Sequence, residues 1–353
     1  MANLGLPSIE IVFKQLGTSA IERGESGVVA MVLEKELEPT PKIKEIYSAS
    51  DIGEEFDAHQ KSLIISCLQG GVKGINKLIV VTAQDTPKGV AALINQDFNY
   101  LVTPYIDGDS CTEIITTVEQ LREEGKMVKY VVANKKSDKP FVINFTTQGI
   151  QVAGEPVETK AFTSRIAGII ASMPLSMSVT YYALPEVENI EVLSKTQINS
   201  KIGQGELVLV NDGKKVKIAR GVTSVTTTGA EIPESFKKIK VLAIADLIKS
   251  DIAHTLEDDY IGKYPCDYDH KCLLVSAINS YLQTLEREML LDSGSYCEID
   301  LDSQRQYLES TGIKTSAMTE DQILMANTGD KVYLTVHAKI VDVIEDIKID
   351  INI

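Results

Sequence analysis

The sequence contains no tryptophan, and aromatic residues make up only 6% of its 353 residues. Basic residues are also in deficit, because 35 Lys and Arg face 50 Asp and Glu and leave a formal net charge of −15. Proteins that wrap nucleic acid need excess cations to neutralise phosphates, and single-strand binders stack bases on aromatic rings. Anionic membrane surfaces also repel an acidic protein. We therefore expect neither nucleic acid nor a membrane as a partner.

Cysteines are few, odd in number and widely spread, at Cys67, Cys111, Cys266, Cys272 and Cys297. Disulfide-dependent secreted domains carry denser, even sets, so we expect folding in a reducing, intracellular compartment. Residues 1–14 lack the basic segment and continuous apolar stretch of a signal peptide. The longest uncharged run, residues 166–185, is interrupted by Gly168 and Pro174. It predicts a buried helix that ends at Pro174 and a following strand, and not a membrane span.

Short glycine-rich runs do not match the motifs that bind phosphate or activate a nucleophile. Residues 70–74, Gly-Gly-Val-Lys-Gly, follow a predicted helix and precede a predicted strand, whereas a phosphate-binding loop requires the opposite order. This run is therefore interpreted as a helix C-cap and turn. Residues 24–27 are one residue short of a nucleophile elbow, and residues 203–205 lack the third glycine of a dinucleotide-binding fingerprint.

Three clusters contain potential metal ligands or catalytic groups: Cys266, His270 and Cys272; Glu298, Asp300 and Asp302; and Asp251, His254 and Glu257. The first has no fourth ligand nearby, so a loop entering a helix is the simpler interpretation. The second falls on one face of a predicted strand, where the alternatives are a magnesium site and the commoner solvated face. The third is interpreted as a surface charge group on one helix face. None of the four histidines lies beside a plausible nucleophile, so we expect no enzyme, no metal and no cofactor.

Strands and helices alternate through the first half of the chain. Apolar runs predict strands at residues 27–33, 77–82, 100–106 and 127–133, and helices between them at 60–68, 88–95 and 112–124. This alternation predicts a largely parallel sheet with helices on its faces. A strand pair from Phe141 to Val152, which turns at Gly149, is expected to close this half.

The second half mixes helices with hairpins. Apolar side chains at helical spacing predict helices at residues 162–173, 244–256 and 274–289. Asn211-Asp212-Gly213 predicts a hairpin between strands at 206–210 and 215–219. Thr319 and Gln322 form a capping box for a short helix that ends at Asn327, and the last strands are expected at 331–339 and 347–353. The predicted fold class is α/β (α+β mixed), a strand-helix alternating core with mixed sheets.

Both ends of the chain show the period of an extended strand. The alternating apolar residues are Ile9, Ile11 and Phe13 at the start, and Ile347, Ile349, Ile351 and Ile353 at the end. Chain ends are usually polar and fray, so this pattern requires a pairing partner. Two interpretations stay open: edge strands in the protein's own sheet, and arms that add to the sheet of a neighbouring subunit.

Several stretches follow one another in a familiar order and spacing. They are Gly5-Leu6-Pro7 with Ile9, and residues 18–24, 27–30, 165–171, 218–224, 236–241, 246–248 and 260–263. Together they resemble contractile phage tail sheath proteins, most closely the short sheaths of defective prophages and R-type bacteriocins (diffocin-like particles). The resemblance extends over essentially the whole chain, and it depends on this order rather than on one decisive motif.

The resemblance implies a structural subunit that assembles with itself into hexameric rings. These rings would stack around an inner tube and contract to drive the tube through a bacterial envelope. Baseplate and tail terminator proteins would be further partners. The protein would assemble in the cytoplasm of the bacterial host and then belong to an extracellular phage tail or bacteriocin particle. The alternative is a nucleotide- or metabolite-binding α/β enzyme, which negative-stain microscopy would distinguish by the absence of tubes or rings.

The implied domains are an N-terminal linking arm at residues 1–20, an α/β domain at 21–158, a C-terminal α/β sheath domain at 159–345 and a strand arm at 346–353. Both arms would link each subunit to its neighbours. Sheaths of this family touch the tube through a helix shortly before the final strands. That helix corresponds here to Thr319, Glu320, Asp321, Gln322 and Ile323. Larger members carry outer domains, for which 353 residues leave no room.

Overall fold

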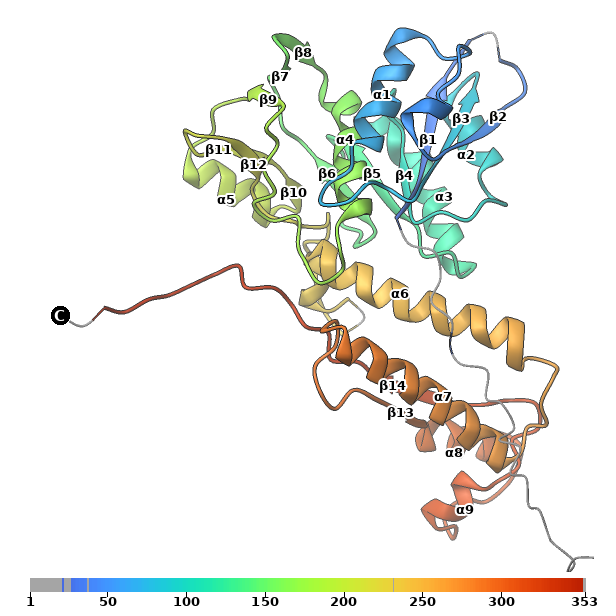
Figure 1. Ribbon diagram of the computed structural model, residues 1–353. Coiled ribbons are helices and arrows are strands. Elements are labelled where there is room, and N and C mark those ends of the chain that lie inside the picture. Colours follow the sequence, from blue (N-terminus) through green and yellow to red (C-terminus); the bar gives the residue numbers. More distant parts are fainter. Residues whose placement is uncertain (1–20, 22–26, 37, 231, 352–353) are drawn as a thin grey trace, which may run out of the picture. The chain divides into compact units, whose positions relative to one another are not determined.

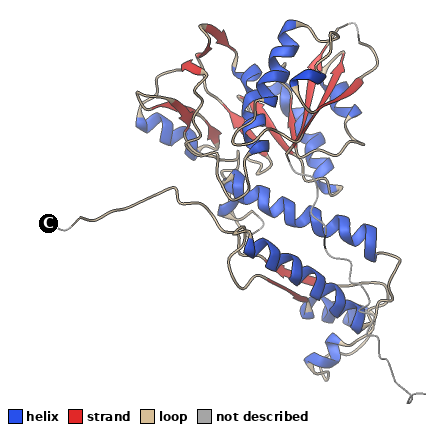
Figure 2. Ribbon diagram, in the orientation of Figure 1, coloured by secondary structure: helices blue, strands red, loops and turns tan. Residues whose placement is uncertain are grey.

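The computed structural model describes residues 21, 27–36, 38–230 and 232–351 (Figure 1). These residues form two compact units. The first, called the α/β unit, comprises the described residues of 27–253 together with 288–290 and 340–351. The second, called the helical unit, comprises residues 254–287 and 291–339. Both units contain helices and strands (Figure 2).

A seven-stranded sheet in the order β10-β6-β5-β4-β1-β3-β2 forms the centre of the α/β unit. Its strands are β1 (Val28–Glu34), β2 (Lys42–Ile46), β3 (Lys77–Ala83), β4 (Tyr100–Val102), β5 (Lys129–Ala133), β6 (Val142–Phe145) and β10 (Glu206–Leu207). Neighbouring strands are parallel except β2, which runs antiparallel to β3 at one edge. The central strands are near-continuous apolar runs because both faces of a parallel sheet are buried. The predicted parallel α/β core is confirmed.

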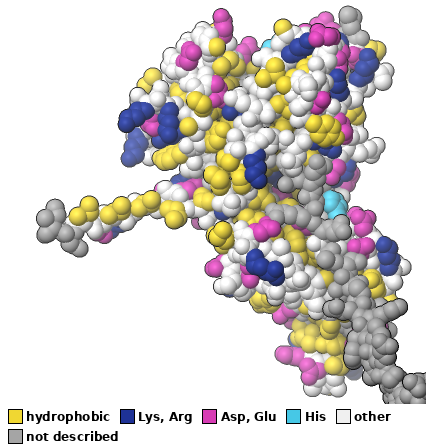
Figure 3. Space-filling model, in the orientation of Figure 1, with side chains coloured by type: hydrophobic (Ala, Val, Ile, Leu, Met, Phe, Trp, Pro, Cys, Tyr) yellow, Lys and Arg dark blue, Asp and Glu magenta, His cyan; other side chains and the backbone are white. Residues whose placement is uncertain are grey.

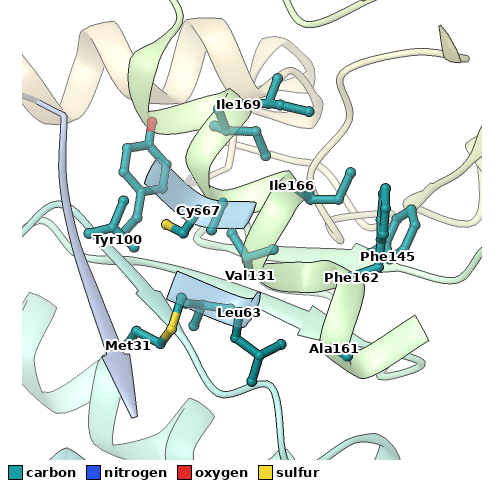
Figure 4. Close-up of a cluster of buried hydrophobic side chains, with 14 of the residues drawn as sticks. Met31, Leu63, Cys67, Tyr100, Val131, Phe145, Ala161, Phe162, Ile166 and Ile169 are labelled. Carbon is teal, nitrogen blue, oxygen red and sulfur yellow. The ribbon is translucent and has the colours of Figure 1, made fainter. Parts of the chain in front are cut away.

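Helices cover both faces of this sheet. They are α1 (Ala58–Leu68), α2 (Thr86–Ala92), α3 (Thr112–Glu123) and α4 (Thr159–Ser172). Successive side chains of a strand point to opposite faces, so β1 contributes to two layers. Val29 and Met31 belong to the apolar cluster that includes α1 and α4 residues (Figure 4), whereas Val28 and Ala30 belong to the cluster that includes α2 and α3 residues.

Helices α1 and α4 pack against each other at a glycine. A Cβ atom on Gly168 would lie 2.1 Å from the carbonyl oxygen of Cys67, closer than side chains tolerate. The hydrogen of glycine therefore lets the two backbones meet directly, among apolar neighbours that include Ile166 and Ile169 (Figure 4). After α1, Gly70 has φ of +60°, the left-handed conformation typical of a helix end. The interpretation of residues 70–74 as a C-cap and turn is confirmed.

Two smaller sheets also lie in the α/β unit. Their strands, with a nearby helix, are β7 (Ile150–Val152), β8 (Glu155–Val157), β9 (Val187–Asn189), α5 (Lys195–Gly203), β11 (Leu209–Asn211) and β12 (Val216–Ile218). The hairpin at residues 211–213 is confirmed, although residues 206–207 leave it to pair with β6. The expected strand pair from Phe141 to Val152 is wrong, because β6 joins the main sheet and β7 pairs with β8 and β9.

The strand expected after Pro174 is also wrong. Residues 175–186 contain turns and one isolated bridge, from Ala183 to Lys217. Tyr181 in this stretch has φ of +58°, which a strand does not accommodate.

Helix α6 (Ile239–Thr255) is joined to α3 and β5 by a buried ion cluster. Asp246, whose side chain is 6% exposed, pairs with Arg122 of α3 at 2.7 Å and with Lys129 of β5 at 2.9 Å. Burial alone would raise the pKa of Asp246, but the two cations hold that pKa below its usual value. Three elements far apart in sequence therefore meet at one carboxylate.

The interpretation of Asp251, His254 and Glu257 as a surface charge group is wrong for Asp251. This residue is 1% exposed, whereas His254 and Glu257 are exposed. Asp251 follows Ile244 and Ile248 at helical spacing along the buried face of α6, so its side chain points inward with theirs. Beyond Thr255, a π-helical turn at Leu256–Tyr260 also changes the spacing to Glu257.

The helical unit is built around one long helix. Its elements are α7 (Tyr268–Arg287), β13 (Tyr296–Ile299), α8 (Leu301–Ser310), α9 (Glu320–Leu324) and β14 (Leu334–His337). Strands β13 and β14 form a two-stranded antiparallel sheet beside α7. Lys271 of α7 is buried and donates hydrogen bonds to Gln304 of α8 at 3.4 Å and to Thr328 at 2.7 Å. These bonds connect α7 with α8 and with the segment that follows α9.

The expectation that Glu298, Asp300 and Asp302 share one strand face is wrong. Strand β13 ends at Ile299, and Asp300 instead caps α8 by accepting from the main-chain N–H of Ser303 at 2.9 Å. Asp302 lies inside α8. An aspartate N-cap satisfies a main-chain donor that would otherwise have no partner, which explains why the chain turns helical here.

The compact units do not divide at residues 158 and 159, where the boundary between two domains was expected. Helix α4 begins at Thr159 and packs on β1, β4 and β5, so it belongs to the same core as the strands before it. The division lies after Ala253 instead.

Candidate assembly surfaces

The C-terminal segment, residues 340–351, contains one isolated bridge residue, Ile340, and no helix or strand (Figure 1). Ile347, Ile349 and Ile351 are 73%, 75% and 80% exposed. Hydrophobic side chains follow one another along this segment in Figure 3. Within the described residues, therefore, the predicted strand of the subunit's own sheet does not form here. Ile353 lies outside the described residues.

The root of this segment is held by charges. Glu345, whose side chain is 5% exposed, accepts a hydrogen bond from the Thr180 hydroxyl at 2.6 Å and pairs with Lys238 at 3.0 Å and Arg220 at 3.1 Å. Asp342 pairs with Lys238 and Asp346 pairs with Arg220. We call Asp342, Glu345 and Asp346 with their cations the root cluster.

The electrostatics of the root cluster favour its ionised form. Burial would raise the pKa of Glu345, but the hydrogen bonds from Thr180 and Lys238 outweigh it and hold the pKa below its usual value. The hydrogen bond to Asp346, ahead of other contributions, raises the pKa of Arg220. Lys240 also donates to the carbonyl oxygen of Val341 at 2.8 Å. The segment is therefore held at Val341, Asp342, Glu345 and Asp346, whereas the side chains of Ile344, Ile347, Ile349 and Ile351 are exposed.

The sequence did not single out the root cluster. Its acidic residues lie more than 100 residues from its cations in the sequence, so no local pattern joins Glu345 to Arg220 or Lys238. One signal was available, because acidic residues precede the alternating isoleucines directly. The N-terminal arm residues Ile9, Ile11 and Phe13 lie outside the described residues.

Helix α9 carries the five candidate tube-facing residues. Thr319 caps it as predicted, accepting from the main-chain N–H of Gln322 at 3.3 Å. Glu320, Asp321 and Gln322 are exposed, whereas Ile323 is 1% exposed. The helix ends at Leu324, before the expected Asn327.

Gln304 of α8 anchors the end of α9 by donating to the carbonyl oxygens of Ile323 and Leu324. These bonds take up carbonyls that a helix end leaves without an internal partner. The helix thus presents an acidic N-terminus to solvent while its apolar residue and its carbonyl end are held by the helical unit.

The cysteine and histidine side chains considered as possible ligands or catalytic groups make ordinary structural contacts. The Cys266 thiol donates to the carbonyl oxygen of Lys331 at 3.5 Å, and His270 lies 2.6 Å from an oxygen of Asp267. Burial raises the pKa of the Cys67 thiol to about 12 and of Cys297 to about 11. Among the described residues, no three His, Cys, Asp or Glu side chains lie close enough to hold a metal ion.

None of the described helices combines the length and the apolar character needed to cross a membrane.

Known families match most of the chain. Residues 80–224 match the model of the phage tail sheath protein central domain, and residues 231–353 match that of the phage tail sheath C-terminal domain. The sequence is 38% identical over 357 residues to the tail sheath protein of Clostridium phage phiCD119, and the match covers 99% of both chains.

Solved sheath structures have a similar fold. The sheath tail protein from Desulfitobacterium hafniense has a TM-score of 0.68 at 18% identity, covering 84% of this chain and 94% of that one. The contracted sheath of the PVC extracellular contractile injection system has a TM-score of 0.71 at 14% identity, covering 100% of this chain and 98% of that one. At such identities the likeness shows a shared fold.

Proposed function

This chain belongs to the phage tail sheath family, and on that basis we propose that its subunits join as hexameric rings stacked around an inner tube. It is a structural subunit of a contractile sheath and not an enzyme. The nucleotide- or metabolite-binding alternative is set aside, because the relatives are sheath proteins. In the proposed particle, contraction drives the tube through a bacterial envelope, and baseplate and tail terminator proteins bind the two ends. Assembly takes place in the host cytoplasm, and the finished phage tail or bacteriocin particle is extracellular.

The observation that carries the proposed linkage is the C-terminal segment, which is fixed at Glu345 and exposed at Ile347, Ile349 and Ile351. Burying three isoleucines would stabilise a complex by about 5–9 kcal/mol. Ordering five residues costs about 5–10 kcal/mol, so burial alone does not hold the segment in place. Main-chain hydrogen bonds of an added strand supply the difference. The segment therefore acts as an arm that pairs with a neighbouring subunit, as does the N-terminal arm at Ile9, Ile11 and Phe13.

Deleting residues 347–353 tests this role of the arm. The truncated subunit should keep its circular dichroism spectrum and lose assembly in negative-stain images, because the root cluster and both cores are untouched. Ile349→Asp should act in the same way by placing a charge on the buried face of the strand. Val192→Asp is the matched control, because Val192 is 95% exposed outside the arm. Sheaths formed by the truncated chain would contradict the proposal.

The tube contact is assigned to the N-terminal end of α9, at Thr319, Glu320, Asp321 and Gln322, whereas Ile323, also expected there, is buried and cannot face the tube. A negative helix N-terminus suits a basic patch on the tube, and such a contact is sensitive to salt. Reversing Glu320 and Asp321 to lysine should impair assembly on tubes while subunit folding is kept. The same reversal at Glu123 and Glu124, exposed at the end of α3, changes net charge equally and should have no effect. Stable extended particles from the α9 variant would remove this helix from the tube interface.

A further inference from the structure

A groove of about 860 Å³ lies beside β13 in the helical unit. Its apolar lining comes from Val275 of α7, Ile299 of β13, Leu301 of α8 and Leu324 of α9. The carboxylates that line it are Glu298, Asp300, Asp302 and Glu320. Within the part of the chain that the structure describes, the sheet beside α7 has two strands, and Thr335 and His337 of β14 also line the groove.

Asn279 of α7 closes the edge of β13 at one position. Its Oδ1 accepts from the main-chain N–H of Cys297 at 2.7 Å, and its Nδ2 donates to the carbonyl oxygen of Cys297 at 3.0 Å. A paired antiparallel strand residue makes the same two bonds, one accepted and one donated. The side-chain amide of Asn279 therefore imitates a residue of an added strand.

The ladder between β13 and β14 shows which groups of β13 face outward. The N–H of Asp300, one residue beyond the strand, donates to the carbonyl oxygen of Tyr333 on the β14 side. Along an antiparallel strand, the main-chain N–H and C=O groups of successive residues point alternately toward and away from the partner strand. Those of Glu298 therefore point toward β14, like the N–H of Asp300, whereas those of Cys297 and Ile299 point away from β14. A strand added at this edge would hydrogen-bond to the main chain of Cys297 and Ile299. The side chain of Asn279 already occupies the main-chain groups of Cys297.

We propose that Asn279 is an edge-blocking residue that occupies β13 in the free subunit and is displaced when a strand from a second copy joins. This rests on the proposed function, which supplies the strand, residues 347–351. In an added strand its isoleucines would share the face of Ile299, and Lys348 would lie on the opposite face with the acidic Glu298. When the added strand replaces Asn279, the main-chain N–H and C=O of Cys297 each exchange one hydrogen-bond partner for another, so both stay bonded. An unblocked edge would pair with any exposed strand, so the block restricts this edge to a strand that also fills the groove.

Binding of a synthetic peptide with the sequence of residues 343–353 tests the block. The full-length subunit is used at a dilution where sedimentation shows a monomer, and affinity and hydrogen exchange at Cys297 are measured. Asn279→Ala should bind the peptide about 10-fold more tightly, because two hydrogen bonds no longer have to be broken. Its free Cys297 amide should exchange faster than in the wild type. Ser280→Ala, the exposed neighbour on α7, should leave affinity and exchange unchanged.

Two further variants keep the test decisive. Asn279→Asp retains the acceptor for Cys297 and loses the donor, so it should give a smaller gain in affinity, and it replaces Asn279→Ala if that variant does not fold. Ile299→Pro removes an outward N–H without touching the ladder to β14, and it should weaken binding. Equal affinity of both Asn279 variants and the wild type, with Cys297 protected by peptide in all three, would overturn the block and leave strand pairing intact. No binding to any variant would overturn both the block and the proposed arm.

Discussion

Replacing Gly168 by alanine measures how closely α1 and α4 pack. In an exposed helix this change stabilises by about 1 kcal/mol, because alanine favours the helix. Here the new methyl would lie 2.1 Å from the carbonyl oxygen of Cys67, against a closest normal approach of 3.0 Å, so the helices must separate by roughly 1 Å. Overpacking costs about 1–3 kcal/mol, and a helix backbone cannot rotate aside, which places this site near the upper value. We expect a net loss of about 2 kcal/mol, or about 4–8 °C in Tm.

The assay is urea and thermal unfolding followed by far-UV circular dichroism, with two controls. Gly203→Ala, at the end of α5, adds a methyl with no atom within 4 Å and should leave stability unchanged or raise it by up to about 1 kcal/mol. Adding Cys67→Ala to Gly168→Ala should not restore stability, because the obstacle is the main-chain oxygen and not the thiol. A Gly168→Ala protein as stable as the wild type would refute the reasoning.

Three further predictions concern charge and energy. Asp246→Asn leaves the buried Lys129 and the partly buried Arg122 without a carboxylate. It should lower the free energy of unfolding in urea by about 3–5 kcal/mol, whereas Asp350→Asn, at an exposed site, should change it little. The folded-state pKa of Glu345 is lowered, so its stabilisation of the root cluster is fully present above the unfolded pKa of about 4.3 and is lost as the pH falls through the lower folded value. Hydrogen exchange of residues 341–346, corrected for intrinsic rates, should therefore rise only below about pH 4. This dependence should be weaker in Glu345→Gln, where Asp342, whose pKa is also lowered, still pairs with Lys238. Contraction should proceed from stored packing energy without ATP or magnesium, and Cys266→Ser and Cys272→Ser should assemble normally. Nucleotide-dependent contraction, or zinc at one per subunit, would contradict that last expectation.

The parallel core could be predicted because its signals are local. Strands such as β1 are buried on both faces and are therefore continuous apolar runs, and helices α1 and α3 are followed closely by Gly70 and Gly125. The hairpin between β11 and β12 and the capping box of Thr319 are likewise contained in a few consecutive residues. Where structure depends on neighbours in sequence, pattern and fold agree.

Elements without an apolar pattern were missed. Strand β2 reads Lys-Ile-Lys-Glu-Ile and forms because the edge of β3 offers main-chain partners to it. Helix α5 buries no side chain, so it has no apolar stripe, although the capping box of Ser194 and Gln197 was a usable signal. Residues 206–207 were assigned to the hairpin, since nothing local shows that β6 competes for them.

Some features of the assembly surfaces are visible in the local sequence, and others are not. Alternation identified the isoleucines from Ile347 onward as a strand pattern that needs a pairing partner, which is a property of the segment itself. The anchoring of Glu345 and the block by Asn279 depend on contacts with residues distant in sequence. Such contacts become visible only when the fold brings their elements together.

The root cluster has a mechanical consequence for a sheath that changes length. Asp346, the last residue held by Arg220, directly precedes Ile347, so no slack separates the fixed end of the arm from its pairing residues. A long flexible linker would let joined subunits move apart, whereas the single peptide unit between residues 346 and 347 spans less than about 4 Å. In the proposed sheath, joined subunits would therefore rotate about this point more readily than they would slide apart. The backbone angles at residues 346 and 347 would absorb that rotation.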